Sequence, residues 1–218
     1  MPAKLFSNYI NPDDIEKTMK DGIVDFEKFG LALEPSEVRE WFLHSPFLKK
    51  EGLTEAAKAI QCVGATRFDF RPITPNSYFA SVLSDAIRRK LLEAGKSFTF
   101  ETVMSAPDKV ELLREAQTRG YRTYLYFVST ESSAINLLRV ANRVAEGGHN
   151  VPSDKILARY GRSLTLVREA VRYSNRAYFF DASQSATMYV AEITDGKVID
   201  LKSDEMPNWF KQYVWDRF

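Results

Sequence analysis

Short segments rich in aromatic and β-branched residues alternate with helical patterns along the chain, and this alternation restricts the possible folds most. The composition of these segments predicts strands at 97–102, 122–128 and 177–181. Apolar residues at helical spacing predict helices at 79–91 and 107–120. Strand, helix, strand, helix, strand is the order that builds a parallel sheet with helices on its faces, so we expect an α/β fold.

The two ends of this pattern carry different signals. Strands predicted at 188–193 and 197–201 are joined by Asp195-Gly196, which is typical of a tight antiparallel turn, so we predict a C-terminal β-hairpin. The region 22–75 shows short helical patterns followed by a proline-containing stretch, 67–77, that indicates a loop. This region is either a helical insertion beside a substrate pocket or ordinary packing.

The size and charge of the chain exclude several classes of protein. With 218 residues, of which 44% are hydrophobic, it can bury one sizeable core, and we expect a single domain over 1–218. Thirty Lys and Arg against 29 Asp and Glu leave a net charge of +1, which provides no general attraction to nucleic acid or to an anionic membrane. We find no apolar run long enough to cross a membrane and no signal-peptide core.

The single cysteine, Cys62, excludes an internal disulfide. Together with His44 and His149 it offers no metal-ligand spacing, so no protein metal site is expected. These features are typical of a reduced, cytoplasmic protein.

Acidic residues follow a short apolar strand near the start of the chain. Asp13 and Asp14 come just after Tyr9-Ile10, at the carboxyl end of the strand, where open α/β sheets bind ligands. A carboxylate placed there could accept a proton from a hydroxyl group during phosphoryl transfer. Alternatively, Asn11-Pro12-Asp13 is a turn and helix cap, which needs the same residue types.

A second carboxylate, Glu101, lies at the end of an aromatic strand segment and is followed by Thr102. A charged group in so apolar a segment is costly unless it has a partner. Glu101 is therefore a candidate for binding substrate or supporting a metal, or it lies on the exposed side of an edge strand.

Basic residues gather on one face of a predicted helix. At about 100° per residue, Ile156, Tyr160, Leu164, Val167 and Val171 share one side of this helix and Lys155, Arg159 and Arg162 share the opposite side. Arg139 and Arg143 lie one turn apart on the preceding helix. Between the helices, 146–152 contains a glycine pair suited to a lid or hinge, with His149 predicted to be exposed. Such faces are either phosphate-binding or merely solvated.

Three long blocks carry a family resemblance: FTFETVMS at 98–105, GYRTYLYFVST at 120–130 and RVANRVAEGGHNVPSDKILARYGRS at 139–163. They resemble the zeta-toxin-like family of P-loop kinases, over roughly residues 9–183. The resemblance implies a P-loop NTPase-like sheet, ATP and Mg²⁺ as cosubstrates, and a nucleotide sugar such as UDP-N-acetylglucosamine as the phosphoryl acceptor. It also implies an antitoxin protein as partner.

The resemblance also assigns roles to individual residues. Asp13 matches the proton-accepting aspartate, and Glu101 with Thr102 matches a pair that faces the substrate sugar or the metal. The segment VMS after Glu101 departs from the polar turn of the best-known members and indicates a different acceptor contact.

The remaining matches lie in the second half of the chain. A helical lid over 139–176 is implied to carry residues that reach the phosphate or substrate, and these residues are Arg143, His149, Arg159 and Arg162. Asp181 and Ser183, in FFDAS, match a segment near the adenine pocket, although Ala182 replaces the usual amide.

The phosphate-binding loop of such a kinase, G-x-x-x-x-G-K-[ST] after the first strand, is missing from the 218 residues. Gly95-Lys96-Ser97 copies only its tail, because Lys90 stands in place of the first glycine and the order is helix then strand. We interpret this tripeptide as a helix end. Because the first strand lies in the middle of such a sheet, its absence should leave two unpaired strand edges.

Three interpretations follow: an active kinase, a catalytically dead pseudokinase or binding module, or a truncated gene product. If the sheet lacks its central strand, we expect marginal stability and re-pairing of strands or recruitment of a second copy.

Overall fold

The computed structural model describes residues 8–31, 34–148 and 150–218. The chain divides into two compact units, 1–102 and 103–218, and each is described on its own. The sequence predicted one domain over 1–218, and that prediction stays untested.

The first unit is built on a pair of short parallel strands and two helices. Strand β1 (Tyr9–Ile10) pairs with β5 (Thr99–Phe100), and helices α1 (Pro12–Lys20) and α5 (Ser77–Glu93) pack against each other. The Asn76 side chain caps α5 by accepting a hydrogen bond from the Tyr78 amide at 3.0 Å. Gly95 ends α5 with a left-handed φ of 68°. The interpretation of Gly95-Lys96-Ser97 as a helix end is therefore confirmed.

The region 22–75 shares one hydrophobic core with α1 and α5. Its strands form an antiparallel sheet in the order β2-β4-β3. The bounds of its elements are β2 (Ile23–Asp25), the 3₁₀ helix η2 (Phe26–Phe29), α2 (Pro35–Leu43), α3 (Pro46–Lys50), α4 (Thr54–Ala57), β3 (Gln61–Val63) and β4 (Arg67–Asp69). The predicted short helices are confirmed. The loop predicted from residue 67 is wrong at its start, because β4 pairs on both sides there.

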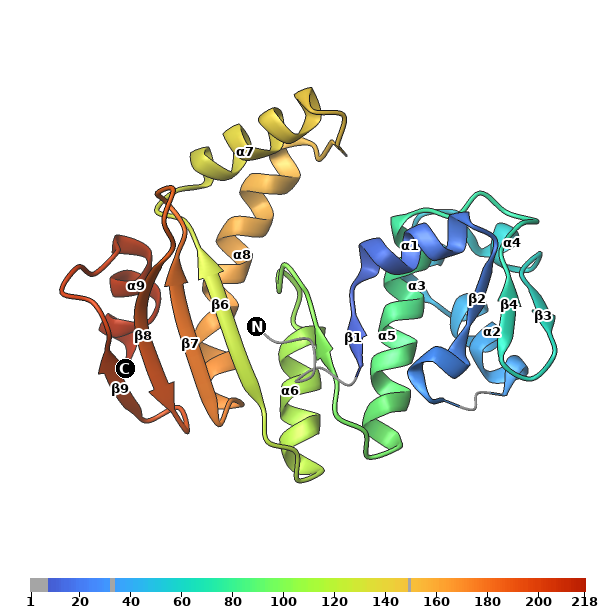
Figure 1. Cartoon of the computed structure of the whole chain (residues 1–218), viewed down its shortest axis with the longest axis horizontal. Helices are drawn as coiled ribbons and strands as arrows, with labels where there is room; N and C mark the ends of the chain where they lie inside the picture. The colour runs from blue at the N-terminus through green and yellow to red at the C-terminus, as the bar shows by residue number, and fades with distance from the viewer. Residues whose placement is uncertain (1–7, 32–33, 149) are drawn as a thin grey trace. The chain divides into compact units, whose positions relative to one another are not determined.

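The second unit is a four-stranded sheet in the order β6-β7-β8-β9 (Figure 1). Strands β6 (Tyr124–Ser129) and β7 (Arg176–Asp181) are parallel, and β8 (Met188–Thr194) and β9 (Val198–Leu201) continue the sheet antiparallel. Asp195 and Gly196 adopt positive φ of 50° and 61°, as a type I′ turn requires, so the predicted hairpin is confirmed. The helical elements are α6 (Asp108–Thr118), α7 (Ser133–Ala145), α8 (Ser153–Arg172), α9 (Asn208–Tyr213) and the 3₁₀ helix η3 (Trp215–Arg217).

The prediction of a large parallel P-loop sheet is wrong for the described residues. They form sheets of two, three and four strands, with one parallel pair in each unit. Among these residues, β5 pairs only with β1 and β6 pairs only with β7. A continuous parallel sheet needs a strand that bonds to both free edges, and no described segment does so.

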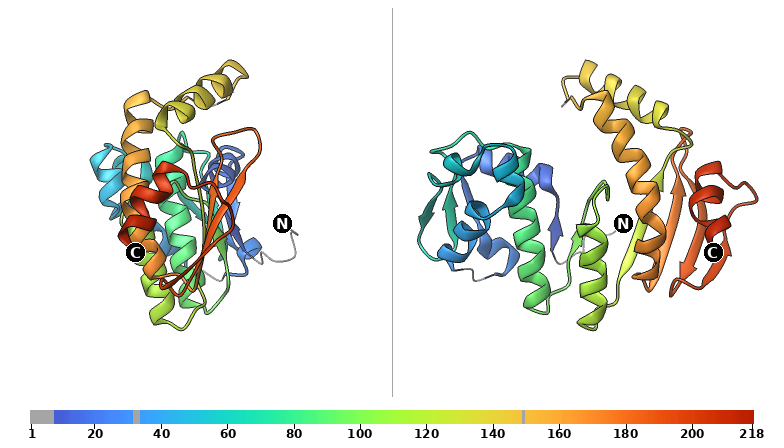
Figure 2. Two further views of the ribbon diagram at one scale, coloured as in Figure 1. Left: turned by 90° about the vertical axis from the view of Figure 1, so that its left-hand side faces the viewer. Right: turned by 180° about the vertical axis from the view of Figure 1, so that it is seen from behind.

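Helices cover one face of the second unit's sheet. Figure 2 shows α8 and α9 on the same side of the strands, where Phe179 and Phe210 are fully buried. On the opposite face Tyr126 is 47% exposed and stacks on Tyr178, with ring centroids 4.8 Å apart. The prediction of helices on both faces is therefore wrong for the described part of this unit. A parallel strand is normally covered on both faces, but one face of β6 is exposed.

Candidate functional site

Glu101 is held by two side chains from the segment around β1. The Tyr9 hydroxyl donates a hydrogen bond to the Glu101 carboxylate, and Asn11 Nδ2 donates to Glu101 Oε2 at 3.2 Å. The hydrogen bond to Glu101, with burial, raises the pKa of Tyr9 above its ordinary value. The Glu101 carboxylate is exposed to solvent and held by these two hydrogen bonds. It therefore avoids the desolvation cost of a buried, unpaired charge.

Asn11-Pro12-Asp13 begins helix α1, and Asn11 supplies the capping side chain. The Asn11 side chain caps α1 by accepting a hydrogen bond from the Asp13 amide at 2.9 Å. The Asp13 carboxylate is exposed in the first turn and makes no hydrogen bond or ion pair with the residues that the structure describes. The alternative that Asn11-Pro12-Asp13 is a turn and helix cap is therefore confirmed, with Asn11 as the capping side chain. The cap does not use the Asp13 carboxylate, which faces solvent beside the residues that hold Glu101.

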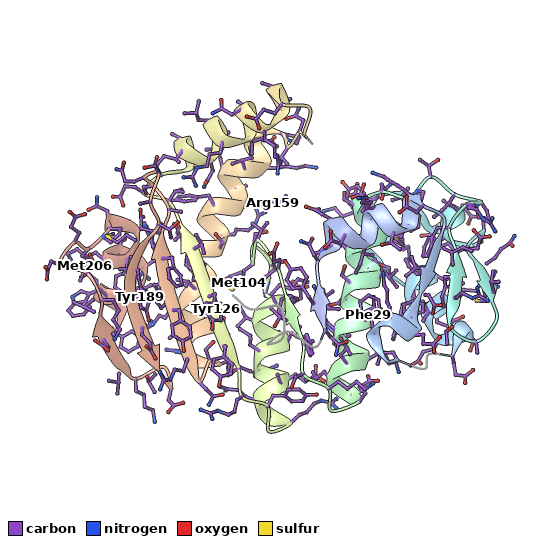
Figure 3. The ribbon with its side chains drawn as sticks, in the orientation of Figure 1. Phe29, Met104, Tyr126, Arg159, Tyr189 and Met206 are labelled. Atoms are coloured by element: carbon purple, nitrogen blue, oxygen red, sulfur yellow. The ribbon has the colours of Figure 1, made fainter. Side chains whose placement is uncertain are left out.

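A pocket of about 270 Å³ lies at this end of the first unit. Its lining residues are Asn8, Tyr9, Asn11, Asp14, Ile15, Lys28 and Phe29. The Lys28 ammonium lies 5.0 Å from the centroid of the Phe29 ring, which is labelled in Figure 3. Burial lowers the pKa of Lys28, and the charges of Asp14 and Asp25 oppose that shift. No sequence pattern indicated Lys28, because it is an isolated lysine in a region without a clear apolar period.

The predicted basic face of α8 is present in the second unit. Lys155, Arg159 and Arg162 are exposed, while Leu164 and Val167 on the opposite side are buried. Arg162 Nε donates to the Ser105 carbonyl at 3.0 Å, which ties this arginine to the segment before α6. Arg159 is labelled on α8 in Figure 3. The two arginines, one turn apart, present guanidinium groups on one side of the helix.

The glycine pair after α7 forms a helix cap. The Gly147 amide donates to the Val144 carbonyl at 3.0 Å and the Gly148 amide to the Arg143 carbonyl at 2.8 Å, with Gly147 at a φ of 85°. This is a Schellman motif, and it places Arg143 in the last turn of α7. A hinge at this position stays a prediction, and His149 lies outside the described residues.

Asp181 and Ser183 connect the loops that follow β6 and β7. The buried Asp181 carboxylate accepts hydrogen bonds from Trp209 Nε1 at 2.6 Å and from the Ser183 amide at 2.9 Å. The Ser183 hydroxyl in turn accepts from the Glu131 amide at 2.7 Å. Both side chains therefore fix the backbone at the carboxyl ends of the parallel strands, and an adenine contact there stays a prediction.

The comparison with family models decides the family. The model of the zeta toxin family matches residues 76–205, which is more than half of the chain. The chain belongs to the zeta toxin family. No curated protein and no solved structure matches it. Membership of the zeta toxin family implies a kinase-type toxin. The matched range includes the candidate residues Glu101, Arg143, Arg159, Arg162 and Asp181 but not Asp13.

The zeta toxin family implies ATP and Mg²⁺, and the donor set of this chain can be tested against them. The described residues contain no group of three His, Cys, Asp or Glu side chains suited to a metal ion. The 218 residues also contain no P-loop, whose backbone amides and lysine hold the nucleotide phosphates. The residues present do not fit a complete ATP–Mg²⁺ site.

A search of the described residues for membrane-spanning helices finds none with the required length and hydrophobicity.

Proposed function

We propose that this chain carries the acceptor site and phosphate-facing arginines of a zeta-toxin-type kinase. The reaction would transfer a phosphoryl group from ATP to a hydroxyl of a small molecule, such as the nucleotide sugar UDP-N-acetylglucosamine. The observation that carries this proposal is the pair of carboxylates after β1 and β5: Glu101 is held by Tyr9 and Asn11, while the Asp13 carboxylate is left open to solvent.

The two carboxylates have separate roles in the proposal. The fixed Glu101 accepts hydrogen bonds from the acceptor's hydroxyl groups, with Thr102 beside it, and so orients the acceptor. Asp13 takes the proton of the attacking hydroxyl, for which a general base at hydrogen-bonding distance is required.

The arginines supply positive charge. Phosphoryl transfer develops negative charge on the transferring group, and catalysis of this reaction consists mainly of positioning and charge stabilisation. We assign this role to Arg159 and Arg162 on α8, and to Arg143 at the end of α7. The hydrogen bond from Arg162 to the Ser105 carbonyl supports this assignment, because it reduces the freedom of a side chain that must be positioned.

The nucleotide phosphates need groups that these 218 residues lack, so we expect this chain by itself to bind ATP poorly. Asp181 and Ser183 would border the adenine. A pseudokinase or binding module that keeps the acceptor pocket is the second candidate, favoured by the absence of a P-loop. The proposal includes a cytoplasmic location and an antitoxin partner.

Calorimetry on the chain tests the proposal. UDP-N-acetylglucosamine should bind, and Glu101→Ala should abolish its binding, whereas ATP with Mg²⁺ should show no low-micromolar affinity. Low-micromolar ATP binding would contradict the expected loss of the phosphate site. Acceptor binding that survives Glu101→Ala would remove the proposed acceptor site.

A further inference from the structure

Lys28 brings a positive charge to the pocket of the first unit. It lies on η2, and the Asp25 side chain caps this short helix by accepting a hydrogen bond from the Glu27 amide at 3.0 Å. The buried rings of Phe26 and Phe29 anchor η2 on either side of Lys28. In the part of the chain that the structure describes, the Lys28 ammonium has a ring contact with Phe29 but no hydrogen bond or ion pair. Its backbone is therefore held in place while its charge is unpaired.

Three other polar side chains that line the pocket already donate hydrogen bonds within the unit. The Tyr9 hydroxyl and Asn11 Nδ2 donate to the Glu101 carboxylate, and Asn8 Nδ2 donates to a backbone carbonyl at 3.1 Å. An ammonium group has three donors and no acceptor. Lys28 is therefore the strongest hydrogen-bond donor that the described pocket lining offers to a ligand.

The Asp14 carboxylate is the charged acceptor of the same pocket. It is exposed in the first turn of α1 and forms no ion pair with Lys28 or with another described residue. The charges of Asp14 and Asp25 favour the protonated form of Lys28 and oppose the effect of burial on its pKa. A cation and a carboxylate thus line one pocket without contacting each other. A ligand that carries both an anionic group and a hydroxyl group would satisfy both.

The size and the apolar wall of the pocket restrict this ligand further. Its volume of about 270 Å³ lies just below the range of about 300–1,000 Å³ that is usual for drug-sized ligands. It therefore suits one substituted ring better than a whole nucleotide. Ile15 and Phe29, which are 3% and 8% exposed, also line the pocket and provide an apolar surface for the C–H groups of such a ring.

We propose that Lys28 binds the phosphate of a phosphorylated monosaccharide, either free or as the sugar end of a larger acceptor, while Asp14 accepts a hydrogen bond from a sugar hydroxyl. Phosphate is favoured over carboxylate because an ammonium acts as a point charge, which suits a tetrahedral phosphate, whereas planar carboxylates are matched by the fork of an arginine. Lys28 is then a specificity-determining residue that selects phosphorylated sugars over neutral ones.

The pocket adjoins the carboxylate to which we assigned the acceptor. Tyr9 and Asn11 line the pocket and also hold Glu101 by hydrogen bonds. A sugar whose phosphate is bound by Lys28 would present its hydroxyl groups toward Glu101, and two such anchors fix its orientation. This role of Lys28 rests on the proposed acceptor site and adds a charge requirement to it.

The test measures the dissociation constants of N-acetylglucosamine 1-phosphate and N-acetylglucosamine on the full chain by NMR titration. The phosphate should strengthen binding about 10- to 100-fold, the usual effect of one hydrogen bond to a charged group, and added salt should reduce this ratio. Lys28→Met should bring the ratio close to one, whereas Lys28→Arg should keep it because the charge remains. Lys50→Met, at an exposed lysine of α3, is the matched control and should leave the ratio unchanged.

Two further measurements test the ligand class and the role of Asp14. Asp14→Ala should weaken binding of the neutral sugar, because that sugar offers the same hydroxyl groups, and unaltered binding would overturn the role of Asp14. Glucuronate, a sugar that carries a carboxylate, should bind more weakly than the phosphorylated sugar. Equal affinity for glucuronate would overturn the assignment to phosphate.

The outcome for Lys28 can be separated from the outcome for the acceptor site. Equal affinities for the phosphorylated and neutral sugars, or a ratio that Lys28→Met leaves unchanged while the variant keeps its thermal midpoint, would overturn the role of Lys28. If Glu101→Ala still abolished binding, the proposed acceptor site would stand without it. If the ratio depended on Lys28 but Glu101→Ala bound both sugars normally, the sugar-phosphate pocket would be supported and the proposed function of Glu101 would fall.

Discussion

Two side chains after β1, Asn11 and Asp13, differ in their structural contacts. Asn11 caps α1 and also donates a hydrogen bond to Glu101, whereas the Asp13 carboxylate has no structural contact among the described residues. Loss of Asn11 should therefore cost stability, typically about 1 kcal/mol for a helix cap, and loss of the Asp13 charge should not.

We predict that Asp13→Asn will lower turnover about 10²- to 10⁴-fold, the usual effect of losing a positioned general base. Turnover is measured on the chain joined to an upstream strand, G-x-x-x-x-G-K-[ST] loop and helix. Acceptor binding and the thermal midpoint should change little. Unchanged turnover in this variant would leave Asp13 without a catalytic role.

Arg88 provides a test of stability at one residue. It is 1% exposed in α5, its guanidinium carbon lies 4.9 Å from the Phe100 ring centroid, and it pairs with Asp85 at 3.3 Å. Arg88→Ala should cost about 2–5 kcal/mol of unfolding free energy, because it removes a large buried side chain and leaves a cavity. Arg89 pairs with the same Asp85 but is 47% exposed, so Arg89→Ala should cost about 1 kcal/mol or less. Similar losses in urea unfolding of the two variants would contradict the burial argument.

Residue patterns predicted the position of candidate groups but not their partners. Asp13, Glu101 and the α8 arginines stand out because each interrupts an apolar pattern or repeats along one helix face. The hydrogen bond from Tyr9 to Glu101 joins residues 92 positions apart, and no local pattern contains that information. Lys28 was missed for the same reason, since its place beside Asp14 depends on how η2 folds back toward α1.

Elements with a clear period were predicted well. The helices α5, α6 and α8 and the strands β6 to β9 lie where apolar spacing and turn residues placed them. Strands β2, β3 and β4 have only three residues each, which is too short to show an alternating pattern, and their pairing becomes visible only in three dimensions. Long-range pairing, and not local propensity, determines these elements.

Strand β8 makes a pH-dependent contribution to stability. Burial, together with the charge and hydrogen bonding of Glu192, raises the pKa of Tyr189 from 10.0 to about 12. Because the pKa of Tyr189 is higher in the folded chain, its contribution to the free energy of unfolding is present below about pH 10 and is lost as the pH rises toward 12. Tyr189→Phe should reduce the loss of stability in this range, measured by urea unfolding at several pH values.

Absorbance titration of tyrosinate gives the matched measurement. The last transition of the folded chain should be missing in Tyr189→Phe and should move to lower pH in Glu192→Gln. An unaltered titration in Tyr189→Phe would contradict the assignment of that transition to β8.

At the scale of the whole molecule, each unit ends in an open parallel edge. Strand β5 has β1 on one side only, and β6 has β7 on one side only, among the described residues. Tyr124, Tyr126 and Val128 of β6 are 48%, 47% and 60% exposed, which is unusual for a parallel strand. An unpaired edge beside exposed apolar side chains favours association with other strands.

We therefore predict that an upstream strand–loop–helix will stabilise the chain. Burial of several hundred Å² of apolar surface, at about 25 cal/mol per Å², amounts to several kcal/mol, and each kcal/mol raises the midpoint by about 2–4 °C at this chain length. Thermal unfolding of the chain is compared with that of the extended form, and an extension whose strand residues are scrambled is the control. A cooperative, monomeric transition with equal midpoints would show that the edges need no further strand.

The tryptophans give each unit its own optical signal. Trp209 is 2% exposed, and its ring centroid lies 5.7 Å from that of Phe127, within the core of the second unit. Trp41 packs against the core of the first unit, with the Lys90 ammonium 5.6 Å from its ring centroid. The third tryptophan, Trp215, is 41% exposed. Substituting Trp41 and Trp215 by Phe leaves the buried Trp209 as the single tryptophan of the chain. The fluorescence of that variant would follow the unfolding of the second unit without interference from the first.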